Sequence, residues 1–216
     1  MTAELQPTDA LHRAPWRRVV ALGDSIVEGI REPSPGYPDR SWLELVTQRL
    51  ADVSPDLEAT NFGRRDLTAA EVREQQLGPA LACRPDLAFV VAGGNDMLRR
   101  GFDAAAVGSE LSAIIGALRA AGATVVTMDL LDPTGAGHVP EQYRRPMADK
   151  LAQLAGVTRA VADAHGAVHV GLRAQTDAFE PAWFARDGLH LTTAGHAWVA
   201  GVVVRRLDEL GGGGGR

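Results

Sequence analysis

The chain has 216 residues, of which 45% are hydrophobic and 23% charged, so it is long enough to bury a full core in a single domain. Its formal charge of -5 and the absence of a basic block disfavour nucleic acid as a partner. No segment has the length and apolar character of a signal peptide or a membrane span, so we expect a cytoplasmic protein with no membrane partner.

The chain divides into a central domain and two short ends. Residues 1–16 are polar and 211–216 are almost all glycine, so we expect a flexible arm and tail around one domain of residues 17–210. Within that domain, short apolar or β-branched runs alternate with segments of helical periodicity. The predicted strands are residues 18–22, 57–62, 87–92, 124–130 and 167–170. This alternation predicts a three-layer α/β/α fold with a parallel sheet.

Two helix starts carry a capping box, in which a hydroxyl and a carboxylate each satisfy a free backbone N–H. The first pairs Ser41 with Glu44, and the second pairs Thr68 with Glu71. We therefore expect helices to begin just after Ser41 and Thr68.

Polar residues follow several of the predicted strands. In a parallel α/β sheet, ligands bind outside the carboxyl ends of the strands, so these residues are expected to share one edge. The segments are GDS at 23–25, NFGRRD at 61–66, GGND at 93–96 and RDGLH at 186–190. A long loop at 131–145, rich in glycine and proline, is placed to cover a site there.

Ser25 is the candidate nucleophile, and a serine hydroxyl needs a base that takes its proton. His190 is the favoured base, because Asp187 lies three residues before it and can orient the imidazole. His138, in the long loop, is the alternative base, whereas His196 is expected to support packing or hydrogen bonding. The side-chain amide of Asn95 and the N–H of Ser25 are the expected donors to the oxyanion of a tetrahedral intermediate.

These segments, in this order, resemble the blocks of the SGNH, or GDSL-type, hydrolases. Residues 23–25 match the first block, 93–96 the G-x-N-D block, and 187–190 the D-x-x-H block. The resemblance covers nearly all of residues 17–210. It implies a flavodoxin-like five-stranded parallel sheet in the order 2-1-3-4-5, and hydrolysis of esters or thioesters through an acyl-enzyme with no metal and no cofactor.

One block departs from the pattern of this family. The family places a glycine five residues after an asparagine and uses its backbone N–H as an oxyanion donor. Counted from Asn61, that position is Asp66 in this chain. We expect the Asp66 N–H to be the donor, with Gly63 as the fallback.

Substrate contacts are predicted from residues near the same edge. Arg64, Arg65, Arg99 and Arg100 follow strands, and they are either structural or bind an anionic group of the substrate. Trp183 and Phe184 form an apolar wall for an acyl chain or fill the core beneath the loop.

Two other functions remain open from the sequence. An acyltransferase of a biosynthetic pathway would form the same acyl-enzyme and deliver the acyl group to an alcohol or amine instead of water. A flavodoxin-like ligand-binding module would need a phosphate-binding loop after the first strand, and GDSIVEG lacks the Ser/Thr-rich character of such a loop. The favoured prediction is a hydrolase of small-molecule esters or thioesters.

Overall fold

A five-stranded parallel sheet forms the centre of the protein, whose computed structural model describes residues 16–178 and 180–212. Its spatial order is β3-β1-β4-β5-β6, which is the predicted order 2-1-3-4-5 for the five strands counted along the chain. The strands are β1 (Arg18–Gly23), β3 (Glu58–Asn61), β4 (Leu87–Val91), β5 (Thr124–Met128) and β6 (Val168–Val170). The α/β fold and the strand order expected from the sequence are confirmed.

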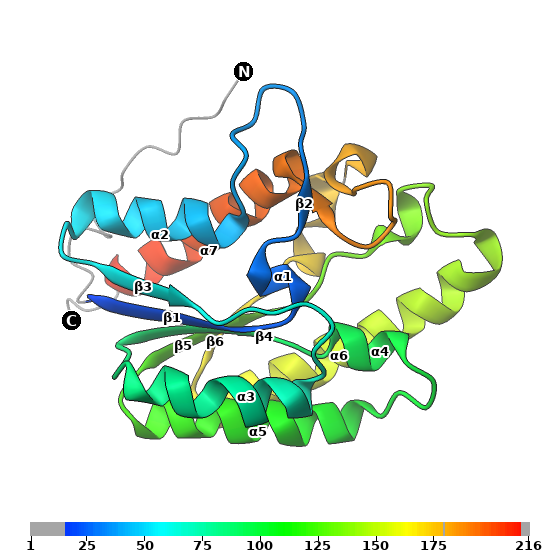
Figure 1. Cartoon of the computed structure of the whole chain (residues 1–216). Helices are drawn as coiled ribbons and strands as arrows, with labels where there is room; N and C mark the ends of the chain where they lie inside the picture. The colour runs from blue at the N-terminus through cyan, green and yellow to red at the C-terminus, as the bar shows by residue number, and fades with distance from the viewer. Residues whose placement is uncertain (1–15, 179, 213–216) are drawn as a thin grey trace.

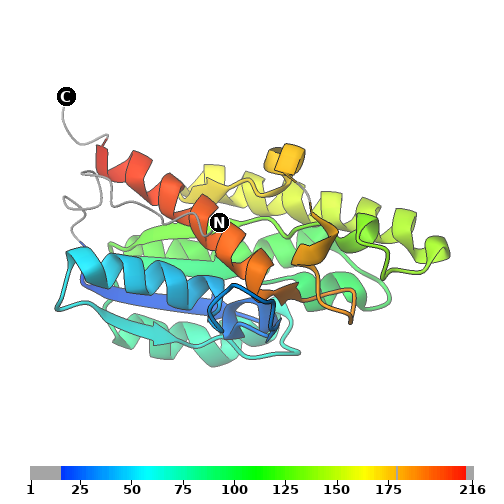
Figure 2. The ribbon, with the colours of Figure 1, turned by 90° about the horizontal axis from the view of Figure 1, so that it is seen from above.

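Helices cover both faces of this sheet, as Figures 1 and 2 show. One face packs against α2 (Trp42–Val53) and α7 (Thr193–Gly212), and the other packs against α3 (Ala69–Ala82), α5 (Ala104–Ala120) and α6 (Glu141–His165). Alternate residues of each strand point to opposite faces of the sheet. In β1, Val19 packs in the core under α2 and α7, and Val20 packs in the core under α3, α5 and α6. The three-layer architecture therefore follows from strands that are apolar on both sides.

Both capping boxes form where the sequence predicts them. The Glu44 N–H donates to the Ser41 hydroxyl at 3.2 Å, and the Ser41 N–H donates to the Glu44 carboxylate at 2.6 Å. The same reciprocal pair joins Thr68 and Glu71 at the start of α3. Each pair satisfies two N–H groups that a helix start would otherwise leave free.

Short elements connect the main layers near the carboxyl edge of the sheet. They are α1 (Ser25–Glu28), α4 (Gly94–Leu98), the strands β2 (Arg31–Glu32) and β7 (Leu191–Thr192), and 3-10 turns at Pro133–Gly135, Arg173–Ala178 and Pro181–Trp183. The β2 and β7 strands pair in parallel as a second small sheet that the sequence did not predict. Strands of two residues are too short for a periodicity to reveal them.

The observed bounds differ slightly from the predicted ones. The strand expected at 124–130 stops at Met128, and the next residue, Asp129, accepts the N–H groups of Leu172 and Arg173 with its carboxylate. Trp16, placed in the arm by sequence, is 5% exposed and belongs to the core. The rest of the expected arm 1–16, and residues 213–216 of the tail, lie outside the described residues; α7 runs through Gly212. Across the described part of the chain, every helix is too short or too polar to cross a membrane.

Candidate active site

Ser25 follows a sharp change from strand to helix. β1 ends at Gly23, where an added Cβ would lie 2.0 Å from the Val91 carbonyl oxygen of the neighbouring strand, so only glycine fits. Asp24 then accepts a hydrogen bond from the Ile26 N–H at 3.1 Å and caps α1. Ser25 is therefore the first residue of α1, directly outside the carboxyl end of the central part of the sheet.

His190 connects Ser25 to Asp187. Its Nε2 lies 2.9 Å from the Ser25 Oγ, and its Nδ1 lies 2.7 Å from an Asp187 carboxylate oxygen. The other oxygen of Asp187 accepts the N–H groups of Leu189 and His190, both at 2.9 Å. Burial opposes the ionised form of Asp187, but these hydrogen bonds together hold its pKa below the ordinary value. Asp187 thus stays ionised and fixes the orientation of the imidazole.

Asp24 is a buried carboxyl directly before Ser25, the candidate nucleophile. It is 2% exposed, and burial raises its pKa to about 6 even though the Ile26 N–H favours the ionised form. The nearby Asp96 raises the pKa further, and His190 lowers it. Asp24 was not predicted as a functional residue, although an aspartate directly before a short helix is a recognised capping signal.

Asn95 lies on α4, which begins immediately after β4. Gly93 caps α4 with a left-handed backbone (φ +105°), and this turn brings Asn95 to the pocket that Ser25 also lines. One N–H of the Asn95 amide donates to the Leu67 carbonyl at 3.0 Å. Since an amide group carries two N–H donors, the second is available to a ligand.

Gly63 and Asp66 are the two candidates for the remaining oxyanion donor, and they differ in whether the backbone N–H is already hydrogen-bonded. The Gly63 N–H donates to the Asn61 side chain at 2.8 Å, so it is already used. Within residues 16–178 and 180–212, no hydrogen bond uses the Asp66 N–H. Asp66 also has a left-handed backbone (φ +68°), a conformation that glycine adopts most readily. This explains why glycine fits the corresponding position of the family pattern.

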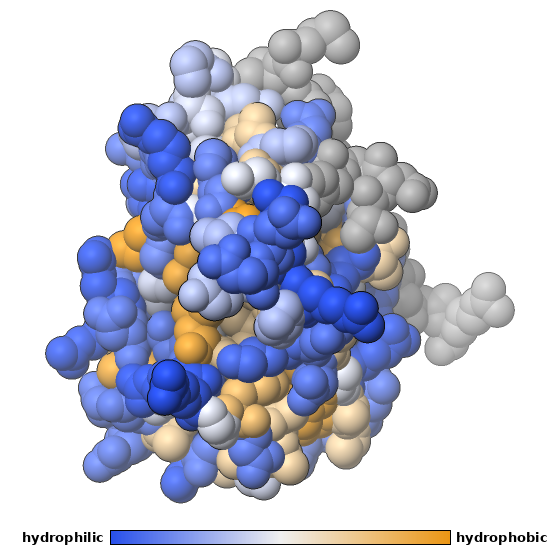
Figure 3. Space-filling view, turned by 90° about the vertical axis from the view of Figure 1, so that its right-hand side faces the viewer, coloured by the Kyte–Doolittle hydropathy of each residue, from blue (hydrophilic) through white to orange (hydrophobic). Residues whose placement is uncertain are grey.

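A pocket begins at Ser25, and its volume is about 690 Å³ when the open solvent at its entrance is included. Figure 3 looks onto this edge of the molecule and shows apolar surface between hydrophilic side chains. Four polar residues contribute to the lining, namely Asp24, Ser25, Asn95 and Asp129. The other walls are mainly apolar and include Met97, Leu98, Met128, Leu130, Leu131, Met147, Leu151, Phe184, Leu189 and Val199. The sequence could not identify this set, because its members come from six separate segments.

The aromatic and cationic residues predicted to contact the substrate do not all line the pocket. Phe184 lines the pocket, whereas Trp183 stacks on Trp198 with ring centroids 4.4 Å apart. None of the four predicted arginines lines the pocket. Arg65 pairs with Glu28 at 3.4 Å, Arg99 with Glu71 at 3.8 Å, and Arg64 reaches Gln75 at 3.5 Å, while Arg100 is exposed.

His138, the alternative base, is close to the loop of Asp187 and His190 but plays no part in the hydrogen bonds of that loop. His138 is exposed, and its Cβ lies 3.1 Å from the position that a Cβ on Gly188 would take. No hydrogen bond of His138 is present among the described residues, and Ser25 is bonded to His190 instead.

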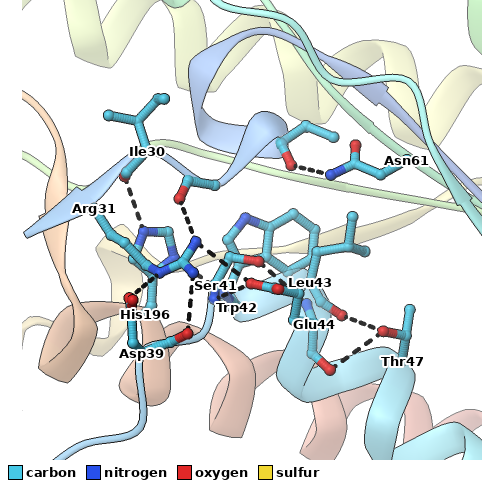
Figure 4. A network of polar contacts seen from close by, with 12 residues as sticks. Ile30, Arg31, Asp39, Ser41, Trp42, Leu43, Glu44, Thr47, Asn61 and His196 are labelled. Carbon is cyan, nitrogen blue, oxygen red and sulfur yellow. Dashed lines mark hydrogen bonds and ion pairs between the residues drawn. The ribbon is translucent and has the colours of Figure 1, made fainter. Parts of the chain in front are cut away.

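His196 is a buried member of the network of polar contacts that Figure 4 shows, where it joins Ile30 to Trp42. Its Nδ1 accepts the Trp42 N–H at 3.0 Å, so its Nε2 carries the proton and donates to the Ile30 carbonyl at 3.1 Å. Burial lowers the pKa of His196 to about 4, against the favourable bond to Ile30. The imidazole is therefore neutral, and the supporting role predicted from sequence is confirmed.

Comparisons with known proteins show which family this chain belongs to. The model of the GDSL-like lipase/acylhydrolase family matches residues 21–198. An arylesterase from Vibrio mimicus is 28% identical over 192 residues, which are 88% of each chain. The lipase/acylhydrolase from Enterococcus faecalis shares the fold with a TM-score of 0.72 at 21% identity, covering 90% of this chain and 96% of that one.

A catalytic mutant of an acetylxylan esterase from Geobacillus stearothermophilus has the same fold, with a TM-score of 0.72 at 18% identity and coverage of 88% and 94%. Structural likeness at such identities establishes the fold, whereas the family match spans most of the chain. The prediction that the protein is a carboxylic ester hydrolase is confirmed at the level of the family. The chain therefore belongs to the GDSL-like lipase/acylhydrolase family.

Proposed function

We propose that this protein hydrolyses small-molecule carboxylic esters or thioesters through an acyl-enzyme at Ser25. His190 takes the hydroxyl proton as Ser25 attacks the acyl carbon, and Asp187 stabilises the resulting imidazolium. His190 then gives this proton to the leaving alcohol or thiol, and later activates the water that releases the acid. The observation that carries the proposal is the continuous hydrogen-bond chain from Ser25 through His190 to Asp187, at 2.9 and 2.7 Å.

Three N–H donors are assigned to the oxyanion in this proposal: the backbone N–H groups of Ser25 and Asp66, and the side-chain amide of Asn95. Asn95 is supported by its place in the pocket lining beside Ser25. Asp66 is supported by its free N–H and its left-handed backbone, and Gly63 is disfavoured because its N–H is already bound. Donors that are held in place before reaction stabilise the developing charge without reorganisation.

The two sides of the scissile bond face different surroundings. Ser25, which binds the acyl carbon, lines the apolar pocket. His190, which protonates the leaving group, lines a separate open groove with Asp187, Arg31, Glu32 and Arg186. We therefore infer an apolar acyl group joined to a polar alcohol or thiol. The arylesterase relative supports an ester substrate, although its name alone does not define the acyl chain.

A panel of esters tests this function. Esters of increasing acyl length are assayed with the wild-type protein and with Ser25→Ala, and each acyl group is presented on a polar and on an apolar alcohol of equal size. An acidic member tests whether the arginines outside the pocket bind a negative charge. We expect hydrolysis that depends on Ser25 and improves beyond acetate; Ser25→Ala with wild-type turnover would refute the nucleophile.

The same panel separates hydrolysis from acyl transfer. Both reactions share the acyl-enzyme, so the assays are repeated with alcohol and amine acceptors and the products are identified by mass spectrometry. We expect free acid as the main product in each case. A transferred acyl group that dominates at millimolar acceptor would assign the protein as an acyltransferase.

A further inference from the structure

Gln76 is a buried polar residue that no step of the proposed reaction uses. It lies in the middle of α3 and is 4% exposed. Its side chain makes two hydrogen bonds to one residue: Oε1 accepts the Gly23 N–H at 2.8 Å, and Nε2 donates to the Gly23 carbonyl at 2.9 Å. Gly23 is two residues before Ser25, so this contact fixes the point from which the nucleophile turn begins.

The unequal lengths of two neighbouring strands explain why Gly23 needs this partner. β3 ends at Asn61, opposite Ala21, whereas β1 continues to Gly23. The Gly23 carbonyl, like that of Ala21, faces the β3 side of the sheet. A buried backbone group without a partner is unfavourable, and a glutamine amide offers one donor and one acceptor side by side. Gln76 therefore provides the acceptor that β3 no longer offers to the Gly23 N–H, and it adds a second donor to the Gly23 carbonyl.

The Gly23 carbonyl also connects the nucleophile turn to the loop that carries Asp66. Besides the Gln76 amide, it accepts the Arg64 N–H at 3.1 Å, two residues before Asp66. The same loop is anchored to α1 by Asn61, whose side-chain amide donates to the Val27 carbonyl at 2.8 Å, as Figure 4 shows. The position of Gly23 thus sets the spacing between Ser25 and the proposed donor at Asp66.

We propose that Gln76 is a positioning residue that holds Ser25 in register with the oxyanion donors. This inference rests on the proposed roles of Ser25 and Asp66. Gln76 does not line the pocket, so it cannot bind the substrate directly. A displacement of about 1 Å at a reacting centre can cost roughly 10²-fold in rate. Loss of the Gly23 contact therefore lowers kcat and leaves KM nearly unchanged.

Gln76→Glu gives a test with a distinctive pH signature. A protonated carboxyl can accept the Gly23 N–H and donate to the Gly23 carbonyl, as the amide does, whereas an ionised carboxylate has no donor and repels that carbonyl. The ratio of variant to wild-type kcat is measured from pH 5 to 9, which cancels the shared dependence on His190. We expect a ratio within about threefold of one at low pH that falls by at least about tenfold as pH rises.

The control is Gln153→Glu, because Gln153 is an exposed glutamine on α6 whose side chain makes no hydrogen bond among the described residues. Its kcat ratio should not change with pH. Circular dichroism and thermal melting at each pH restrict the comparison to folded protein. If Gln76→Glu unfolds at high pH, Gln76→Met tests the positioning role instead, from kcat and KM measured at one pH. We expect its kcat to fall by about 10- to 100-fold and its KM to stay within about twofold of wild type.

Two failures can be distinguished in the same assays. Hydrolysis that survives Ser25→Ala refutes the proposed function itself. Hydrolysis that requires Ser25, combined with a pH-independent Gln76→Glu ratio in folded protein, overturns only the role of Gln76. A folded Gln76→Met variant with wild-type kcat, or with a loss confined to KM, also overturns it.

Discussion

At the scale of single residues, Asp66 stands where the pattern expected from the family resemblance has a glycine. Its backbone is left-handed (φ +68°), and a residue other than glycine is strained there, although aspartate tolerates the conformation better than most. If its N–H stabilises the oxyanion, what matters is the direction of that N–H and not the carboxylate. The family glycine and this aspartate can then provide the same donor.

Substitutions at Asp66 test this directly. Asp66→Gly keeps the N–H and suits the left-handed backbone, so kcat should stay within about threefold of wild type. Asp66→Val favours an extended backbone and should turn the N–H away, with a loss of kcat approaching the roughly 10²–10³-fold typical of a lost oxyanion donor. Steady-state kinetics on one ester, with melting curves as the control for folding, measure both. Equal kcat in the two variants would exclude the Asp66 N–H.

At the scale of elements, the pocket is built between α4 and α6. Leu98 lies at the end of α4 and Met147 on α6, and both line the cavity that begins at Ser25. Met147 is only partly buried, so a larger side chain there can enter the pocket without displacing the centre of the core.

Met147→Trp should therefore shift the preference toward short acyl groups. One methylene in an apolar pocket changes kcat/KM by about 10- to 200-fold, so we expect at least about a tenfold loss for the longest esters and little change for acetate. Tyr143→Trp is the control, because Tyr143 lies one turn earlier on α6 and is 60% exposed. A uniform loss across all chain lengths would contradict this assignment of the acyl pocket.

The capping box of α3 is a second feature at this scale. Thr68 accepts the Glu71 N–H and lies two residues after Asp66, so it anchors the helix that also carries Gln76. Thr68→Ala should lower the free energy of unfolding by about 1 kcal/mol, while Thr68→Ser should restore most of it. Chemical denaturation at neutral pH measures this difference. Equal stability of the alanine and serine variants would show that the hydroxyl contributes nothing.

At the scale of the whole molecule, two buried groups make opposite contributions to the pH dependence of stability. His196 has a folded pKa of about 4, below its unfolded value of 6.5, so its contribution is lost as pH falls from 6.5 through 4. Asp24 has a folded pKa of about 6, above its unfolded value of 3.8, so stability is lost as pH rises from 3.8 through 6. Each shift corresponds to about 3 kcal/mol, and the two nearly cancel between pH 4 and 6.

Asp24→Asn should expose this cancellation. Asparagine can still accept the Ile26 N–H but cannot ionise, so the variant should gain up to about 3 kcal/mol over wild type at pH 8 and little at pH 4. The variant should then lose stability more steeply than wild type on acidification, because the effect of His196 is no longer offset. Urea denaturation at several pH values measures both curves. Parallel curves for the two proteins would show that Asp24 does not titrate as described.

Much of the molecule was predictable from local chemistry. The two helical layers and the starts of α2 and α3 followed from the alternation of apolar runs with helical periods and from the capping boxes. The strand order was expected only from the resemblance to the SGNH hydrolases. Ser25, Asp187 and His190 were predicted as the site because a serine nucleophile requires a base and an orienting carboxylate, and the structure brings these three side chains into one hydrogen-bond chain. Such sequence signals lie within a few consecutive residues.

Contacts between distant segments could be decided only by the tertiary structure. The pocket walls, the separation of Trp183 from Phe184, and the ion pairs of Arg65 and Arg99 depend on which surfaces the packed helices bring together. Gln76 shows the limit most clearly: its place in α3 was predictable, but its bonds to Gly23, 53 residues earlier, were not. The Gly23 N–H needs this partner because β3 ends two residues before β1, and the length difference between paired strands is set by the packed sheet and not by either segment alone.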